Sequence, residues 1–422
     1  MTLIDRILRN VTLVRRAAEI YSTKELLQRS AMRILPSLGK YGLSRDDFAQ
    51  QKERILSEFG AKDEGSKKRV LLVTSNGAGL GHLARMSAVA SRMKSETLIY
   101  TMSSAYSKIG WNRARIIYFP SSGDLGMSSR AWNPLMTAHF SAVLEAFKPD
   151  EVIFDGTFVY RGVVAGTQQE GIPLSWLQRG CWKADVDNFS YQRHHPGEIC
   201  QRVIIPGDFG CEEKVEFAGE IETEYVNPIT LLDANESLDR STACKELGLS
   251  PTKKHFLIQV GAGVINDVTS IRDFAANEVA SLGNEWQAVL VRNPLSAESL
   301  SDEHLSVQAF PLAKYYKAFD AAVLAAGYNS VQESVQMTLP AVFVPNLDTK
   351  TDDQFRRANG IQLDQLGLLA TTEVEMRNAI HKLSLDSFRR DMVQTMLESQ
   401  MPNGAGQVAR ILDAPIVGTG KN

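Results

Sequence analysis

The stretch VLLVTSNGAGLGHLARMSAVA, residues 70–90, decides the fold class of this 422-residue chain. Its first four residues form an apolar run of strand length, a loop with three glycines follows, and apolar residues then recur at helical spacing. A buried strand that leads through such a loop into a helix is the first unit of an open parallel sheet. The sequence therefore predicts an α/β fold, with His82 at the start of the first helix.

Strand-length apolar runs recur in two series along the chain. The first series occupies residues 70–73, 97–100, 116–119, 151–154, 174–177 and 203–205, and the second occupies residues 256–260, 288–291, 307–310, 321–324 and 341–344. A polar stretch without apolar periodicity, residues 227–239, separates the two series. Strands that alternate with helical segments are typical of parallel sheets. The sequence therefore predicts two Rossmann-like domains, residues 66–235 and 236–400, that face each other across a cleft.

Two terminal segments, residues 1–65 and 401–422, lie outside these domains. The second is expected to form a helix and a tail. In the first, apolar residues at helical spacing alternate with arginines, which predicts a basic amphipathic helix. A helix of this kind packs on its own protein or on a second subunit, or it lies on an anionic membrane surface. A homo-oligomer and a peripheral membrane location therefore both stay open.

The composition argues against several classes of protein. Hydrophobic residues make up 44% and charged residues 23%, which is typical of globular proteins, and no apolar run approaches the ~20 residues that span a bilayer. A net charge of -3 without a long basic tract argues against a nucleic-acid partner. Four cysteines without CxxC spacing predict reduced thiols. Asp5, Arg6 and Arg9 argue against a secretory signal, so a cytoplasmic location is expected.

The glycine loop at residues 77–81 is typical of a turn that approaches phosphates. A dinucleotide fingerprint requires a third glycine where this sequence has His82, and the Gly-Lys-Ser/Thr of a P-loop is absent. Gly79 and Gly81 instead offer flexible backbone to a ligand. A histidine at a helix start loses basicity to the helix dipole, which favours the neutral form. His82 is therefore a candidate general base, and a histidine that only caps the helix is the alternative.

A second group of polar residues follows the strand expected at residues 321–324, and its members are Gly327, Asn329, Ser330, Glu333, Asp353 and Gln354. The free backbone amides where the next helix opens suit the phosphates of a nucleotide. The carboxylate of Glu333, one turn later, is suited to a ribose diol, although a plain helix cap is the alternative. Because several polar groups converge on one cleft, the sequence favours a polyhydroxylated ligand.

These motifs resemble inverting glycosyltransferases of the GT-B fold, in particular the family of the lipid-linked N-acetylglucosaminyltransferase of peptidoglycan synthesis and related UDP-glycosyltransferases. The N-terminal loop of that family ends in Gly-His, as Gly81 and His82 do here. Its C-terminal signature has a glycine, small polar residues, a glutamate, a proline before a strand and then Asp-Gln, which the second group matches in order. The resemblance extends over residues 69–412 and implies two Rossmann-like domains.

The resemblance also implies an enzyme that transfers a sugar from a nucleotide, with UDP expected, to a hydroxyl acceptor such as a lipid-linked or cell-envelope glycan. In that family Glu333 would hold the ribose, and Asp353 and Gln354 would lie beside the donor sugar. Retaining enzymes of this fold carry a second glutamate where this chain has Ala325, so inversion is expected. GT-B enzymes generally use helix dipoles and basic side chains in place of a metal ion, so we expect no metal and no other cofactor.

Further candidates follow predicted strands, and they are Asp155, Arg161 and Arg179 in the first domain and Gly261, Gly263, Arg292 and Phe310 in the second. Asp155 is expected to orient His82, as a carboxylate does in a base dyad, or else to cap a helix. The arginines suit phosphates, and structural or surface roles are their alternatives. By the resemblance, the second glycine loop lies near the donor diphosphate and Phe310 lies near the base.

The sequence leaves two other functions open. A nucleotide-sugar 2-epimerase uses two similar domains but needs no acceptor. A non-catalytic nucleotide-sugar-binding protein would keep the fold without turnover, and the long N-terminal extension gives that reading some support.

Overall fold

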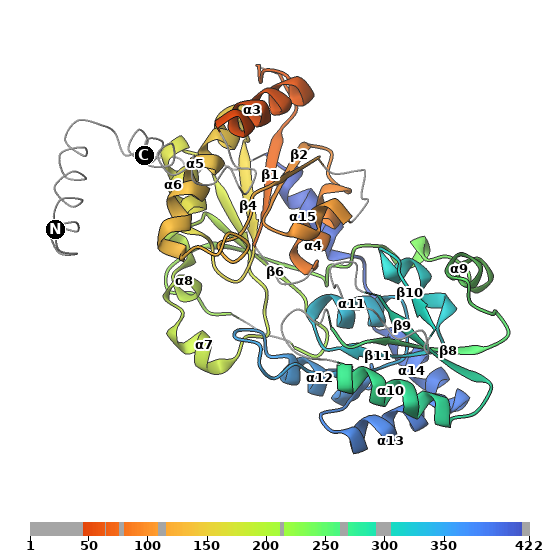
Figure 1. The fold of residues 1–422 in the computed structure, drawn as a ribbon. Coiled ribbons are helices and arrows are strands. Elements are labelled where there is room, and N and C mark those ends of the chain that lie inside the picture. Colours follow the sequence, from red (N-terminus) through yellow and green to blue (C-terminus); the bar gives the residue numbers. More distant parts are fainter. Residues whose placement is uncertain are drawn as a thin grey trace, which may run out of the picture.

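The computed structural model describes residues 45–63, 65–75, 80–108, 115–211, 215–261, 269–292 and 305–415. Figure 1 shows two α/β domains side by side, each built on one parallel sheet. The two-domain parallel-sheet architecture predicted from the sequence is therefore confirmed. The basic helix expected near the start of the chain lies outside the described residues. Within those residues, no helix combines the length and the apolar character that crossing a membrane would require.

The first sheet has seven parallel strands in the order β3-β2-β1-β4-β5-β6-β7. Its strands are β1 Arg69–Thr74, β2 Glu96–Thr101, β3 Arg115–Tyr118, β4 Glu151–Asp155, β5 Leu174–Leu177, β6 Arg202–Pro206 and β7 Glu222–Val226. The strand order reverses between β1 and β4, where Thr74 pairs with Asp155. A crevice forms at such a reversal, because the loops after the two strands leave toward opposite faces of the sheet. His82, near the start of the helix that follows β1, and Asp155 meet at this point.

Helices cover both faces of the first sheet. They are α3 Arg45–Phe59, α4 Gly81–Ala90, α5 Ser129–Phe147, α6 Arg161–Glu170 and, from the end of the chain, α15 Gly404–Asp413. The short helices α7 Ala184–Phe189 and α8 Tyr191–His194 come between β5 and β6 in the chain. One core packs α3, α5 and α6 against one face, and a second core packs α4 and α15 against the other. Figure 1 shows α15 beside α4 and β1. The chain therefore returns to the first domain after completing the second.

The second sheet has six parallel strands in the order β10-β9-β8-β11-β12-β13. Its strands are β8 Lys254–Gln259, β9 Trp286–Val291, β10 Ser306–Val307, β11 Ala321–Ala325, β12 Ala341–Val344 and β13 Leu368–Leu369. The helices of this domain are α9 Arg240–Leu247, α10 Thr269–Ser281, α11 Tyr328–Gln336, α12 Gln354–Leu363, α13 Glu373–Ser384 and α14 Asp386–Glu398. The strand order again reverses at one place, between β8 and β11, which places the start of α11 at the crevice of this sheet.

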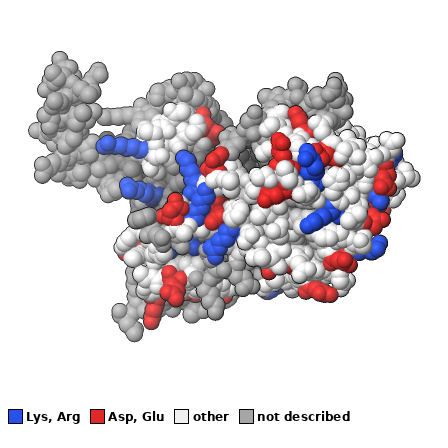
Figure 2. Space-filling view, turned by 90° about the horizontal axis from the view of Figure 1, so that it is seen from below, with Lys and Arg blue, Asp and Glu red and all other residues white. Residues whose placement is uncertain are grey.

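A buried joint holds the domains together beside α12. The guanidinium of Arg357 lies between two carboxylates, with Nη2 2.7 Å from Asp208 Oδ2 of the first domain and 2.8 Å from Asp352 Oδ1 of the second. The backbones also approach closely there, because a Cβ added to Gly360 would lie 1.9 Å from the carbonyl oxygen of Gly210. This joint fixes one side of the space between the domains. On the face shown in Figure 2, acidic and basic residues are interspersed over both domains.

Candidate active site

A cavity of about 250 Å³ lies between the two domains. The predicted site residues that line it are Gly81, Gly261, Arg292, Phe310, Asn329, Ser330 and Glu333. Most of its other lining residues are apolar, among them Leu80, Ala84, Leu231, Val291 and Leu312. Polar groups that converge within a mainly apolar hollow are typical of a small-molecule site.

His82 and Asp155 are in contact beside this cavity, next to Gly81, although neither is among the residues that line it. His82 is the second residue of α4, and Asp155 is the last residue of β4. The His82 Nδ1 atom lies 3.0 Å from Asp155 Oδ1. When Nδ1 donates its proton to the carboxylate, the lone pair of Nε2 is left for a ligand. The contact expected from the sequence is therefore present.

The protonation states of this pair follow from its surroundings. Burial lowers the pKa of His82 below its usual 6.5, and the cations of Arg85 and Arg179 lower it further against the opposing effect of Asp155. Burial opposes the ionisation of Asp155, but Arg85 and His82 outweigh it and lower the pKa of Asp155 to about 2. At neutral pH the site therefore holds a neutral imidazole beside a carboxylate, which is the state in which a histidine accepts a proton.

Arg85 belongs to this site, although the sequence analysis did not identify it. Its Nε and Nη2 atoms donate to the two oxygens of Asp155 at 3.0 and 2.9 Å, and its Nη1 donates to Asn329 Oδ1 of the second domain at 3.2 Å. The signal in the sequence was its position three residues after His82, which places both side chains on one face of α4.

The first turn of α11 faces the cavity from the second domain. Gly327 is the N-cap of this helix and has no side chain that could satisfy the first backbone amides. Asn329 and Ser330 follow within the first turn and line the cavity. Because these N–H groups lack partners within the helix and the helix dipole adds positive potential, the start of α11 is suited to an anion such as a phosphate.

Glu333 lies one turn further along α11 and lines the same cavity. Burial raises the pKa of Glu333 from 4.5 to about 7, although the backbone of Leu231 favours the charged form. The carboxylate therefore lacks enough hydrogen-bond donors to stabilise its charge. A ligand that brings a pair of hydroxyl groups would supply them.

Gly261 after β8, Arg292 after β9 and Phe310 after β10 complete the second-domain wall. Gly261 has a φ of +115°, which an L side chain rarely adopts, so the chain needs glycine where it passes the cavity. Arg292 directs its Nε to the hydroxyl of Ser306 at 2.7 Å and also lines the cavity. Phe310 contributes apolar surface. These residues surround the space opposite the start of α4.

Asp353 and Gln354 are not among the residues that line the cavity. The carboxylate of Asp353 caps α12 by accepting the Arg356 N–H at 3.0 Å. The Gln354 Oε1 atom accepts the Asn346 N–H at 3.0 Å. Both side chains therefore make local backbone contacts, and the donor-sugar role implied for them stays a prediction.

The remaining predicted residues are placed as follows. Arg161 begins α6 and is exposed, away from the cavity lining. Arg179 follows β5, and its Nη2 lies 3.9 Å from Asp352 Oδ1 across the domain boundary. Gly79 and Gly263 lie outside the described residues.

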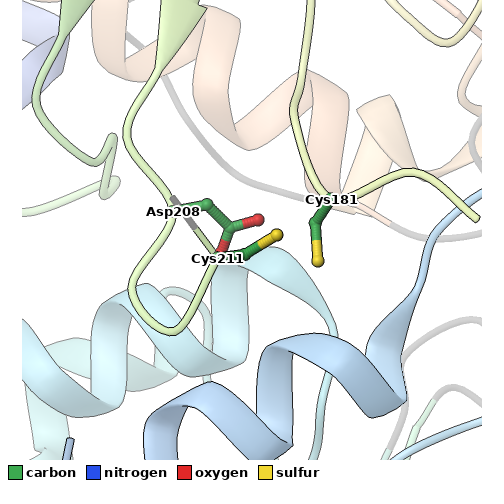
Figure 3. Close-up of side chains that lie close together, drawn as sticks. All are labelled: Cys181, Asp208 and Cys211. Carbon is green, nitrogen blue, oxygen red and sulfur yellow. The ribbon is translucent and has the colours of Figure 1, made fainter. Parts of the chain in front are cut away.

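Cys181, Asp208 and Cys211 form a cluster at the domain joint, and their potential metal-ligating atoms all lie within 4.8 Å of one another. Figure 3 shows the three side chains converging from the loops that follow β5 and β6. The carboxylate of Asp208 is already bound by Arg357 and by Gln332 Nε2, the latter at 2.7 Å. Hydrogen bonding to Cys211 and burial raise the pKa of the Cys181 thiol. We therefore assign this cluster to the joint between the domains.

No family model matches the sequence. A relative in Bacillus subtilis (strain 168) is 26% identical over 64% of this chain and 75% of its own length. It is the UDP-N-acetylglucosamine--N-acetylmuramyl-(pentapeptide) pyrophosphoryl-undecaprenol N-acetylglucosamine transferase.

Solved structures share the fold over most of this chain. The glycosyltransferase of kitacinnamycin has a TM-score of 0.59 and 13% identity, with 82% of this chain and 98% of that chain covered. MurG of Acinetobacter baumannii has a TM-score of 0.54 and 14% identity, with 82% and 99% covered. The spinosyn rhamnosyltransferase SpnG complexed with thymidine diphosphate has a TM-score of 0.53 and 13% identity, with 81% and 99% covered. By sequence and by fold, the relatives of this chain are therefore glycosyltransferases of the GT-B fold, which confirms the predicted resemblance.

Proposed function

We propose that this protein is an inverting glycosyltransferase that transfers a sugar from a nucleotide donor, with UDP as the nucleotide, to a hydroxyl group. One observation carries the proposal. His82 of the His82–Asp155 pair follows directly on Gly81, which lines the cavity from the first domain, while Asn329, Ser330 and Glu333 of α11 line it from the second. The candidate proton acceptor thus lies beside the cavity that the candidate anion site lines, an arrangement suited to group transfer with a diphosphate leaving group.

In the proposed reaction, Nε2 of His82 accepts the proton of the acceptor hydroxyl while the oxygen attacks C1 of the donor sugar. The new C1–O bond forms as the bond from C1 to the diphosphate oxygen breaks, and the configuration at C1 inverts. Asp155 holds the Nδ1 proton and stabilises the imidazolium that forms. The lowered pKa of His82 keeps it ready to accept a proton at neutral pH.

The leaving diphosphate carries the charge that develops in this step. The free amides at the start of α11, near Ser330, are suited to stabilise it without a metal ion. The ribose of the nucleotide would hydrogen-bond to Glu333, and the base would pack against Phe310. The name of the Bacillus subtilis relative includes a UDP-sugar donor, and SpnG was solved with thymidine diphosphate, so both support a pyrimidine nucleotide.

The acceptor is proposed more broadly, as a lipid-linked or other cell-envelope glycan. The Bacillus subtilis relative is named for transfer to a pyrophosphoryl-undecaprenol acceptor. Arg179, which lies near His82, and the exposed Arg161 are the candidates that would meet an acidic acceptor. An acceptor of this kind would place the protein at the inner face of the membrane.

The proposal is tested by incubating the protein with UDP-sugars and dTDP-sugars, with and without a lipid extract as acceptor, and measuring released nucleoside diphosphate. We expect acceptor-dependent release from a UDP-sugar, with a product whose anomeric proton coupling shows inversion. Formation of an epimerised sugar without acceptor would instead show a 2-epimerase. Binding without turnover across the panel would indicate a non-catalytic binding protein.

A further inference from the structure

Arg85 occupies the junction between the proposed base and the proposed donor site. Its side chain is only 3% exposed, so the guanidinium is removed from water and needs several partners. Two of its N–H groups bind the two oxygens of Asp155 in a fork. A fork of this kind fixes the orientation of a carboxylate as well as its charge. Arg85 therefore determines how Asp155 faces His82.

The contact between Arg85 and His82 bears on which imidazole nitrogen holds the proton. His82 Nδ1 lies 3.0 Å from Asp155 Oδ1 and 2.7 Å from Arg85 Nη2. If Nδ1 donates to the carboxylate, Nε2 has a free lone pair, but if Nδ1 accepts from the guanidinium, the proton is on Nε2. Only the first state leaves Nε2 with a lone pair that can accept a proton. The position of the guanidinium thus selects between an active and an inactive tautomer.

The same guanidinium reaches the second domain. Its Nη1 donates to Asn329 Oδ1 at 3.2 Å, and it lies over the ring of Tyr328 at 5.1 Å. Both residues belong to the first turn of α11, where the donor phosphates are proposed to bind. Asn329 Nδ2 also donates to the Gly81 carbonyl oxygen at 3.4 Å, so the starts of α4 and α11 meet here. The guanidinium of Arg85 therefore contacts the His82–Asp155 pair and the first turn of α11 at the same time.

We propose, on the basis of the function proposed above, that Arg85 is a positioning residue that ties the His82–Asp155 pair to the first turn of α11. Phosphates bound at α11 turn one N–H of Nη2 away from His82 Nδ1, while Nε and the other N–H of Nη2 keep the fork to Asp155. The Nδ1 proton then rests on Asp155, and Nε2 is free to accept the acceptor proton. His82 therefore acts as a base only when phosphates are bound at the start of α11.

The first test follows His82 by NMR in protein labelled at its histidine rings and needs no turnover. The charged groups that face His82 are Asp155 from β4, Arg85 from α4 and Arg179 after β5. Removal of one cation in Arg85→Ala should raise the pKa of His82, whereas Arg85→Lys keeps a charge and should leave it near the wild-type value. Addition of UDP should shift the ring signals toward the Nδ1–H tautomer in the wild type and leave them unchanged in Arg85→Ala.

The second test measures kinetics with the UDP-sugar that the wild type accepts. Arg85→Ala and Arg85→Lys should both lower kcat by about 10²-fold with little change in donor KM, because neither alanine nor lysine can form the fork that orients Asp155 toward His82, even where His82 is free to adopt the Nδ1–H tautomer. Asn329→Ala should lower kcat less, and the double variant with Arg85→Ala should be no worse than Arg85→Ala alone.

Arg69→Lys is the matched control, since Arg69 is a buried, paired arginine of the same domain, 2% exposed, that contacts Glu96 away from the site. It should preserve both kcat and the His82 titration. If Arg85→Ala leaves the His82 pKa and its response to UDP unchanged, the inference is wrong even when the wild type is active. If the wild type transfers no sugar but the NMR results are as expected, the proposed function fails and the positioning role of Arg85 stands.

Discussion

Replacement of Glu333 by glutamine should stabilise the protein at alkaline pH while it weakens nucleotide binding. Glu333 lines the cavity, and its burial makes the charged form unfavourable in the unliganded chain. A residue retained for a ligand at the expense of stability is a common feature of binding sites. The Glu333→Gln variant removes the charge and keeps the shape of the side chain.

The size and sign of the effect follow from the pKa of Glu333, which folding raises from 4.5 to about 7. Below pH 4.5 the group is protonated in both the folded and the unfolded chain and contributes no penalty. The folded chain holds this proton more tightly, so the free energy of unfolding falls as the pH rises from 4.5 to 7. Above pH 7 the carboxylate is charged in both states. The rise in its pKa from 4.5 to about 7 then lowers the free energy of unfolding by up to about 3 kcal/mol.

The assay is the difference in Tm between Glu333→Gln and the wild type, measured by calorimetry at pH 5 and at pH 8. We expect a small difference at pH 5 and a more stable variant at pH 8, together with a loss of UDP affinity in titration calorimetry. Glu375→Gln is the control, because hydrogen bonds from Thr371 and Thr372 lower the pKa of Glu375 and its replacement should destabilise the protein at pH 8. An equal difference at both pH values, or unchanged UDP affinity, would refute the reasoning.

Further predictions concern the base and the domain joint. His82→Ala should lose about 10²–10⁴-fold in kcat and keep its UDP affinity, and near-normal turnover would remove the base assignment. The pKa of His82 is lowered, so kcat should persist below pH 6.5. The pKa of Glu333 is raised to about 7, so the donor KM should rise as the pH falls through 7. Gly360→Ala should cost about 1–3 kcal/mol or more in urea unfolding, because its Cβ would meet the Gly210 carbonyl at 1.9 Å. Gly406→Ala, also in a helix but with no atom nearer than 3.9 Å, should gain about 0.5–1 kcal/mol, and equal effects of the two changes would contradict the close approach.

Local patterns were sufficient to predict most strands of both sheets. Strands such as β1 and β11 are buried on both faces and appear as continuous apolar runs. Two strands were missed for physical reasons. β7 lies at a sheet edge and carries partly exposed polar residues, and β13 has only two residues. Neither presents an apolar run that a sequence pattern can detect.

The candidate site was predicted in part. Residues in the first turns of a helix that follows a strand, such as His82, Ser330 and Glu333, are found at the cavity or beside it. Asp353 lies at the start of a helix too, but its side chain caps α12. Position near the start of a helix therefore predicts the region of a residue but not the partner that its side chain chooses.

The sequence by itself determined the α/β class, the two tandem sheets and the loops that carry the candidate residues, because burial and helix starts leave a periodic pattern within a few neighbouring residues. Only the tertiary structure decided which distant groups meet. The contact of Arg85 with Asn329, the joint of Arg357 with Asp208 and the return of α15 to the first sheet join residues 149 or more positions apart. Such contacts depend on how two closed domains pack against each other, and no local periodicity encodes that packing.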